Sequence, residues 1–129
     1  MGIWLGVGGK RTLALVGRAA DGWVPSSGWA TPDKLGDMQA RIDEAAVTAG
    51  REPAEIRRVY NVWGLIDGPG GFLNGPAGQW VDELTELAVD SGMDTFVFGP
   101  SADPVSQSQR FANEVAPAVR ERVAQQRGG

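Results

Sequence analysis

The sequence of 129 residues contains no cysteine and no histidine. Without thiolate or imidazole groups, the chain cannot form a disulfide, a Cys-His or Ser-His catalytic pair, or an ordinary zinc, copper or iron–sulfur site. No pair of carboxylates stands out as an acid–base couple, so the sequence identifies no catalytic residue and predicts no metal site. Any redox reaction would therefore depend on a bound cofactor.

Positive charge is also scarce, because 12 Lys and Arg stand against 16 Asp and Glu and the pI is near 4.7. Nucleic acid and anionic membranes attract clustered Lys and Arg, and the sequence has no such cluster. The apolar runs are far shorter than the roughly 20 residues of a membrane span. The first ten residues lack the basic region of a signal peptide. We expect one cytoplasmic domain, residues 1–129, that binds neither nucleic acid nor membrane.

Short apolar runs alternate with segments of helical periodicity along the chain. Runs rich in β-branched and aromatic residues predict strands at 3–7, 22–25, 56–63 and 95–98. Apolar residues at 3.6-residue spacing predict helices at 10–20, 31–50, 76–92 and 103–122. The order β-α-β-α-β-α-β-α predicts an α/β fold with a parallel sheet and right-handed crossovers. The periodicity does not distinguish two folds, a doubly wound sheet and four units of a (βα)8 barrel.

Two segments interrupt this regular pattern. The glycine-rich connection at 64–75 is long for a compact domain, and such loops are often lids or ligand loops. Pro117 falls inside the last predicted helix, where its ring removes a backbone donor and clashes with the preceding turn. We therefore expect that helix to bend or to split in two.

The five tryptophans divide into two groups by position. Those inside predicted strands and helices are expected in the core, whereas those at strand ends or in loops are candidates for ring stacking. The first group is Trp4, Trp23 and Trp80, and the second is Trp29 and Trp63. Arg18 and Asp21 flank the start of a strand, so an ion pair or a cap is the expected role for them.

Residues 17–23 read Gly-Arg-Ala-Ala-Asp-Gly-Trp and follow a strand that ends in glycines and then a helix. This arrangement resembles the luciferase-like monooxygenase family of flavin- and deazaflavin-dependent oxidoreductases. The resemblance continues, in the family's order, through residues 49–56, 75–80, 92–96 and 111–120. It implies a TIM barrel of which this chain supplies the C-terminal half, four βα units, as a natural half-barrel or a truncated product. The family's N-terminal half, with most substrate-contacting side chains, would be absent.

The resemblance implies a flavin- or deazaflavin-dependent oxidoreductase or monooxygenase fragment with FMN or coenzyme F420 as cofactor and a small-molecule substrate. It also implies that residues at the ends of the first two strands help hold the cofactor phosphate: Gly6, Gly8, Gly9, Ser26, Ser27, Gly28 and Trp29. Glycine lets a ligand approach the backbone, and serine donates hydrogen bonds. The same residues would serve equally as turn residues. Trp29 stands where some deazaflavin-dependent members place a cation. Lys10, where many relatives have proline, would either supply a compensating positive charge or, as we prefer, be a solvated lysine of the first helical turn.

Half a barrel would expose an apolar sheet face and two unpaired strand edges in water. A homodimer, a separately encoded N-terminal half-barrel, or flattening into a doubly wound monomer would each remove that exposure. A non-catalytic half-barrel remnant that acts as an assembly or binding subunit is the alternative to an oxidoreductase. The substrate and the choice between FMN and F420 stay open.

Overall fold

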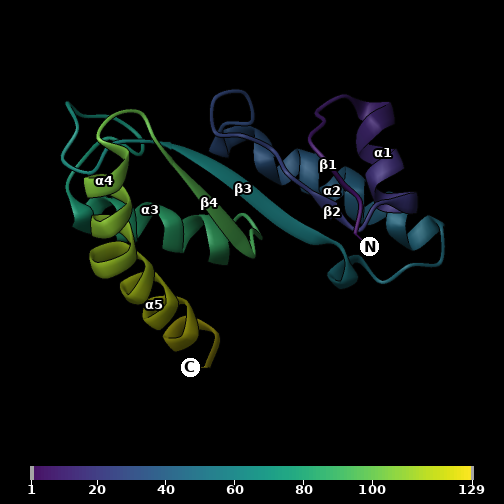
Figure 1. Ribbon diagram of the computed structural model, residues 1–129. Coiled ribbons are helices and arrows are strands. Elements are labelled where there is room, and N and C mark those ends of the chain that lie inside the picture. The colour runs from purple at the N-terminus through teal and green to yellow at the C-terminus, as the bar shows by residue number, and fades with distance from the viewer. Residues whose placement is uncertain (1, 129) are drawn as a thin grey trace. The chain divides into compact units, whose positions relative to one another are not determined.

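The computed structural model describes residues 2–128 and contains alternating strands and helices (Figure 1). The strands are β1 (Trp4–Leu5), β2 (Gly22–Trp23), β3 (Arg57–Gly64) and β4 (Thr95–Pro100). The helices are α1 (Lys10–Ala19), α2 (Pro32–Thr48), the 3-10 turn η1 (Pro53–Glu55), α3 (Ala77–Val89), α4 (Pro104–Arg110), the π-helical η2 (Phe111–Val115) and α5 (Ala116–Gly128). No helix within the described residues is long and apolar enough to cross a membrane.

The four strands form one parallel sheet in the order β1-β2-β3-β4. Trp4 lies opposite Gly22, and Gly22 lies opposite Arg57. Strands of a βα barrel follow one another in chain order, whereas the order reverses at the switch point of a doubly wound sheet. The prediction of four βα units that resemble half a barrel is confirmed.

The contacts of the chain cluster into two compact units. Unit 1 comprises Met1–Asn61 and Ser91–Phe96, and unit 2 comprises Val62–Asp90 and Val97–Gly129. Strands β3 and β4 each give residues to both units, and the helix pair α1 and α2 lies wholly in unit 1. Each unit has its own buried side chains and its own set of hydrogen bonds.

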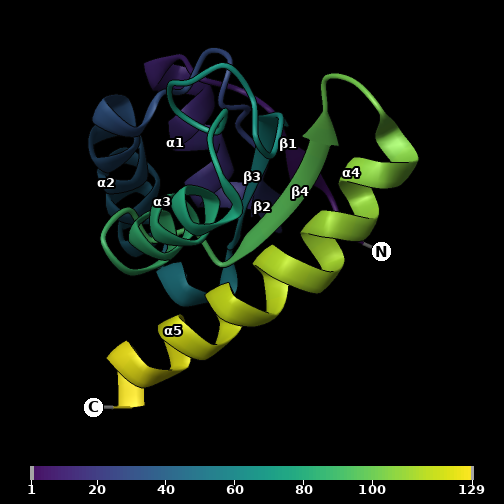
Figure 2. The ribbon, with the colours of Figure 1, turned by 90° about the vertical axis from the view of Figure 1, so that its left-hand side faces the viewer.

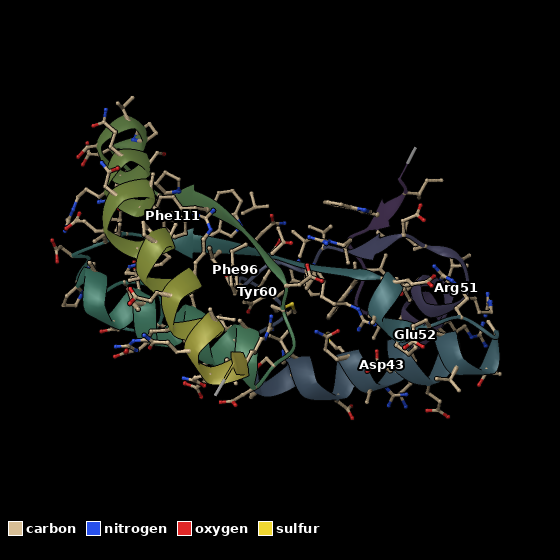
Figure 3. All side chains as sticks on the ribbon, turned by 90° about the horizontal axis from the view of Figure 1, so that it is seen from below. Asp43, Arg51, Glu52, Tyr60, Phe96 and Phe111 are labelled. Carbon is tan, nitrogen blue, oxygen red and sulfur yellow. The ribbon has the colours of Figure 1, made fainter. Side chains whose placement is uncertain are left out.

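In unit 1, Arg51 closes the C-terminal end of α1. The guanidinium of Arg51, which is labelled in Figure 3, donates to the carbonyl oxygen of Gly17 at 2.8 Å and to that of Ala20 at 2.7 Å. The last carbonyls of a helix have no partner within the helix, and a cation there also interacts favourably with the helix dipole. Arg51 belongs to the family-like run at residues 49–56, so this part of the motif has a structural role.

A second arginine of unit 1 is buried at the start of β3. Arg58 donates to Gln39 Oε1 at 2.5 Å and to Asp43 Oδ1 at 2.7 Å, both on α2, and to the backbone oxygen of Pro53 at 3.0 Å. Its own backbone N–H donates to Asp94 Oδ2 at 2.9 Å. Buried charges are tolerated when they are paired and fully hydrogen-bonded. Arg58 therefore joins β3 to α2 and to the residue that precedes β4.

Unit 2 is built around three aromatic rings. Phe98 and Phe111 stack with centroids 4.4 Å apart, and Trp80 meets Phe98 edge-on at 5.3 Å. Phe111 lies on the long C-terminal helix, which runs without a break through α4, η2 and α5 (Figure 2). The π-helical segment ends at Val115, two residues before Pro117, in the turn with which a proline ring would clash in a regular α-helix. The helix is thus neither split nor ended at Pro117, and the expected disturbance takes the form of the π turn.

The tryptophan predictions are confirmed for two of the three expected core residues. Trp23 and Trp80 are fully buried, but Trp4 is 50% exposed. The Trp4 ring lies against Gly22 on the neighbouring strand, where a Cβ atom would come within 2.7 Å of it. The prediction for Trp4 is wrong because, within residues 2–128, helices do not cover its face of the sheet. Trp29 and Trp63 are 40% and 58% exposed, and their stacking role stays a prediction.

Candidate functional site

The residues after β2 form a tight turn that is attached to β3. The backbone N–H groups of Trp29 and Ala30 both donate to the Ser26 carbonyl, at 3.1 and 2.9 Å. Asn61 on β3 donates its backbone N–H to Pro25 O and accepts from Ser27 N, both at 2.9 Å. Its side chain also donates to Ser26 Oγ at 3.2 Å. The backbone of the Ser26–Ala30 turn is therefore fixed before any ligand arrives.

Tyr60 holds the other end of this turn. It is fully buried, and its hydroxyl donates to the Ala30 carbonyl at 2.5 Å. Burial, with a smaller contribution from the charge of Asp33, raises the pKa of Tyr60 to about 12. The hydroxyl is thus a neutral donor at ordinary pH. From the sequence, Tyr60 and Asn61 were expected only to be part of a strand, although their position on the strand next to the turn could have indicated this role.

The glycines after β1 lie beside this turn. At Gly8, a Cβ atom would come within 2.8 Å of the Trp29 ring, so the missing side chain leaves room for the indole. Gly6 lies next to the Val24 carbonyl, where a Cβ would come within 3.1 Å. Gly9 precedes α1 and has no side chain to cap it. The structure therefore brings the seven predicted residues to the neighbouring ends of β1 and β2, and we call them the strand-end cluster.

A hollow of about 490 Å³ adjoins this cluster where α1 and α2 begin. Its charged lining comprises three cations and two carboxylates: Lys10, Lys34, Arg41, Asp33 and Asp37. A hydrogen bond from Thr31 lowers the pKa of Asp33, with a smaller contribution from Lys34. The backbone N–H groups of the first helical turn have no hydrogen-bond partner within the helix. Together with the helix dipole they favour the binding of an anion at this end. The local chemistry suits an anion held by backbone N–H groups and a lysine.

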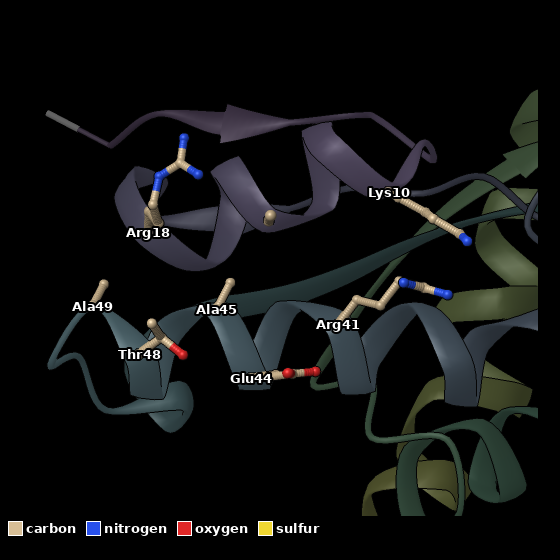
Figure 4. Close-up of a pocket in the computed structure, with 8 residues that line it drawn as sticks. Lys10, Arg18, Arg41, Glu44, Ala45, Thr48 and Ala49 are labelled. Atoms are coloured by element: carbon tan, nitrogen blue, oxygen red, sulfur yellow. The ribbon is translucent and has the colours of Figure 1, made fainter.

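A second hollow of about 410 Å³ lies further along the same two helices. Arg18 and Ala49 lie at one end and Lys10 and Arg41 at the other (Figure 4). Arg18 therefore lines a groove between helices, away from the strand ends. The carboxylate of Asp21 accepts the backbone N–H of Ile3, the residue before β1, at 2.8 Å, so Asp21 has a structural role at the start of that strand.

The long connection after β3 belongs to unit 2 and is tied down by hydrogen bonds. Gln107 pairs with both backbone groups of buried Ile66, accepting its N–H at 2.8 Å and donating to its carbonyl at 3.1 Å. Arg110 forms an ion pair with Asp67 at 2.6 Å. The loop also closes on itself, since Leu65 N donates to Leu73 O at 3.1 Å. In this conformation the loop is an anchored structural element.

Comparison with known proteins connects this geometry to a family. Residues 2–65 match the model of the luciferase-like monooxygenases, a segment that includes every residue of the strand-end cluster. No curated protein matches the sequence significantly. The resemblance noted in the sequence is thus confirmed by a family match to the N-terminal part of this chain.

Solved structures share the fold over almost the whole chain. An F420-dependent secondary alcohol dehydrogenase, in complex with an F420-acetone adduct, has a TM-score of 0.78 at 17% identity over 91% of this chain and 48% of its own. The coenzyme F420-dependent tetrahydromethanopterin reductase from Methanopyrus kandleri has a TM-score of 0.78 at 16% identity over 91% and 50%. Riboflavin lyase, solved with modified FMN and riboflavin, has a TM-score of 0.76 at 15% identity over 92% and 42%. The chain spans about half the length of these proteins.

Proposed function

We propose that the chain is half of a luciferase-like oxidoreductase or monooxygenase barrel and that its strand-end cluster holds the phosphate of FMN or coenzyme F420. One observation carries this proposal. The uncapped start of α1 and the rigid Ser26–Ala30 turn lie side by side, with Trp29 against Gly8. The substrate would be a small molecule, and the location would be the cytoplasm.

The residues present fit a phosphate group. The first-turn amides of α1, Lys10 and the Ser27 hydroxyl are hydrogen-bond donors of the kind that phosphate sites use. A Cβ atom at Gly28 would meet nothing within 4 Å, so the backbone there is open to a ligand. At Gly8 the missing side chain leaves room for the Trp29 ring, and the residue also lines the hollow beside the cluster. When bound, the flavin or deazaflavin ring would supply the redox chemistry, and the chain's residues would orient it.

The test compares two glycine substitutions that the chain itself tolerates. Gly28 and Gly36 both have open space at the Cβ position, but only Gly28 belongs to the strand-end cluster. We expect wild-type protein to change the fluorescence of FMN or of F420 on titration. Gly28→Ala should weaken that binding by about tenfold, corresponding to about 1.4 kcal/mol, because the added methyl group would intrude on the phosphate. Gly36→Ala should leave the affinity unchanged.

Two results would contradict the proposal in different ways. If neither cofactor changes its fluorescence with folded protein, the binding function is wrong. If a cofactor binds but Gly28→Ala and Gly36→Ala have equal affinities, the cofactor lies elsewhere on the chain.

A non-catalytic assembly or binding subunit is the second candidate function. It is favoured by the composition of the chain, which has no thiol or imidazole side chain that could carry a reaction by itself. Folded protein that binds neither cofactor yet associates with a second half-barrel would support this candidate.

A further inference from the structure

The two hollows between α1 and α2 share part of their lining. Lys10 and Arg41 line both the hollow beside the strand-end cluster and the groove further along the two helices. The groove therefore adjoins the proposed phosphate site, and it continues from there to Arg18 and Ala49 (Figure 4). Helix α1 rises by about 12 Å between Lys10 and Arg18. The space thus suits an extended group that leaves the phosphate site.

The groove carries an excess of positive charge. Its charged lining comprises three cations, Lys10, Arg18 and Arg41, and one carboxylate, that of Glu44. This balance is opposite to the net charge of −4 of the whole chain. Within residues 2–128, neither Lys10 nor Arg18 forms an ion pair, and the ion pair of Arg41 with Asp37 is long, at 3.9 Å. These cations are available to the carboxylates of a ligand.

Direct contact between the two helices fixes the walls of the groove. At Gly17 a Cβ atom would come within 2.4 Å of the Ile42 carbonyl oxygen, so the backbones of α1 and α2 meet there. The short side chains of Ala14 and Ala45 leave the space between the flanking cations. Arg51 also holds the end of α1 through the Gly17 carbonyl. All of these residues belong to unit 1, so the groove is formed within that unit before a ligand binds.

We propose that the groove binds an anionic tail of the cofactor and that the cofactor is coenzyme F420 and not FMN. The inference rests on the proposed function, in which the strand-end cluster holds the cofactor phosphate. FMN ends at its phosphate and has no further group to place in the groove. F420 continues beyond its phosphate, through a lactate, into a chain of glutamates that each carry a carboxylate. The glutamate methylene groups would lie against Ala14 and Ala45, and the carboxylates would pair with Arg18 and Arg41.

The test compares two ligands that differ only in this tail. One is F420, and the other is the form of F420 that keeps the phosphate and the lactate but has no glutamate. Both are titrated into the full chain, and the fluorescence of the deazaflavin ring reports binding. We expect wild-type protein to bind F420 about tenfold more tightly than the glutamate-free form, because two exposed arginines pair with carboxylates that only F420 carries. Added salt should reduce this difference.

Arg18 and Arg11 provide a matched pair of variants. Both arginines are exposed on α1, but Arg11 lines neither hollow. Arg18→Gln should weaken the binding of F420 by about three- to fivefold, the effect of one exposed ion pair, and leave the affinity for the glutamate-free form unchanged. Arg11→Gln removes the same charge from the same helix and should leave both affinities unchanged.

Equal affinities of the wild-type protein for F420 and for the glutamate-free form would overturn the proposal, and this comparison needs no variant. A preference for F420 that persists in Arg18→Gln, with a native circular dichroism spectrum, would place the tail elsewhere and would also overturn it. Both results leave the proposed function standing, because the glutamate-free form would still bind and Gly28→Ala would still weaken it. If neither form of F420 nor FMN binds folded protein, the proposed function is wrong and this inference fails with it.

Discussion

Two connections each follow the carboxyl end of a parallel strand, but they differ in length and in their hydrogen-bond partners. The Ser26–Ala30 turn of unit 1 is short, and its bonds go to β3, so that Gly28 and the exposed ring of Trp29 remain accessible. The loop after β3 in unit 2 is longer, closes on itself, and is held by Gln107 on α4. The turn that is hydrogen-bonded to a neighbouring strand leaves Gly28 and the Trp29 ring accessible to a ligand. The loop that is hydrogen-bonded to a helix uses its own backbone N–H and C=O groups in those bonds.

The largest effect should come from the loop of unit 2. At Gly64 a Cβ atom would lie 1.8 Å from the Leu73 carbonyl oxygen, so Gly64→Ala must displace the backbone of the loop. We expect the free energy of unfolding, measured with urea, to fall by more than about 3 kcal/mol. Gly78→Ala is the control, because nothing lies within 4 Å of its Cβ position. Equal stability of the two variants would show that the loop is not anchored as described.

A somewhat smaller effect is expected from the buried arginine of unit 1. Arg58→Ala removes the hydrogen bonds to Gln39 and Asp43 and leaves the Pro53 carbonyl without that donor. We expect a loss of about 2 to 3 kcal/mol in urea unfolding. The neighbouring Arg57→Ala should cost about 0.5 kcal/mol, because its ion pair with Asp94 is at the surface. Similar losses for the two arginines would contradict the role assigned to Arg58.

The smallest effect at neutral pH concerns the support of the Ser26–Ala30 turn. Tyr60→Phe removes the hydrogen bond to Ala30 and should cost about 1 kcal/mol. At high pH the wild type should lose its extra stability over Tyr60→Phe. The unfolded tyrosine releases its proton near pH 10, whereas folded Tyr60 keeps it to about 12, so stability falls as the pH rises through this interval.

Tyr60 is the single tyrosine of the sequence, so the absorbance of tyrosinate reports its ionisation directly. The loss of wild-type stability between pH 10 and about 12 should be on the order of 2 kcal/mol. Tyr60→Phe should lack this dependence. Titration of folded Tyr60 near pH 10 would show that the hydroxyl is not buried against the turn.

Local rules predicted much of the fold from sequence. The strand–helix alternation and the starts of α2 and α4 at Pro32 and Pro104 follow from hydrophobic period and from proline's fixed φ angle. Half of a barrel was indicated by motifs such as residues 17–23. The positions of the site residues at strand ends were also accessible, because parallel strands end at one edge. Whether those residues bind a cofactor stays a prediction.

Other features depend on contacts between residues that are distant in the sequence, which the spacing of apolar residues cannot reveal. Trp4 is a large apolar residue of the kind that fills a core, yet it is half exposed because no helix of the described residues covers its face of the sheet. The glycine-rich loop has the composition of a lid, yet Gln107, more than 40 positions away, holds Ile66 by both backbone groups. The packing of the Trp29 ring against Gly8 is a further contact between distant residues, and the cofactor-binding role of Gly8 stays a prediction.

The sequence by itself determined the order of the elements, the parallel sheet and the absence of thiol and imidazole chemistry, since these follow from local residue patterns and composition. Only the tertiary structure decided which connection is tied down and which stays accessible. It also decided which tryptophans are buried. Those outcomes depend on contacts between side chains that are distant in the sequence. Hydrogen-bond geometry and the space around a Cβ atom decide them, whereas residue patterns are compatible with either outcome.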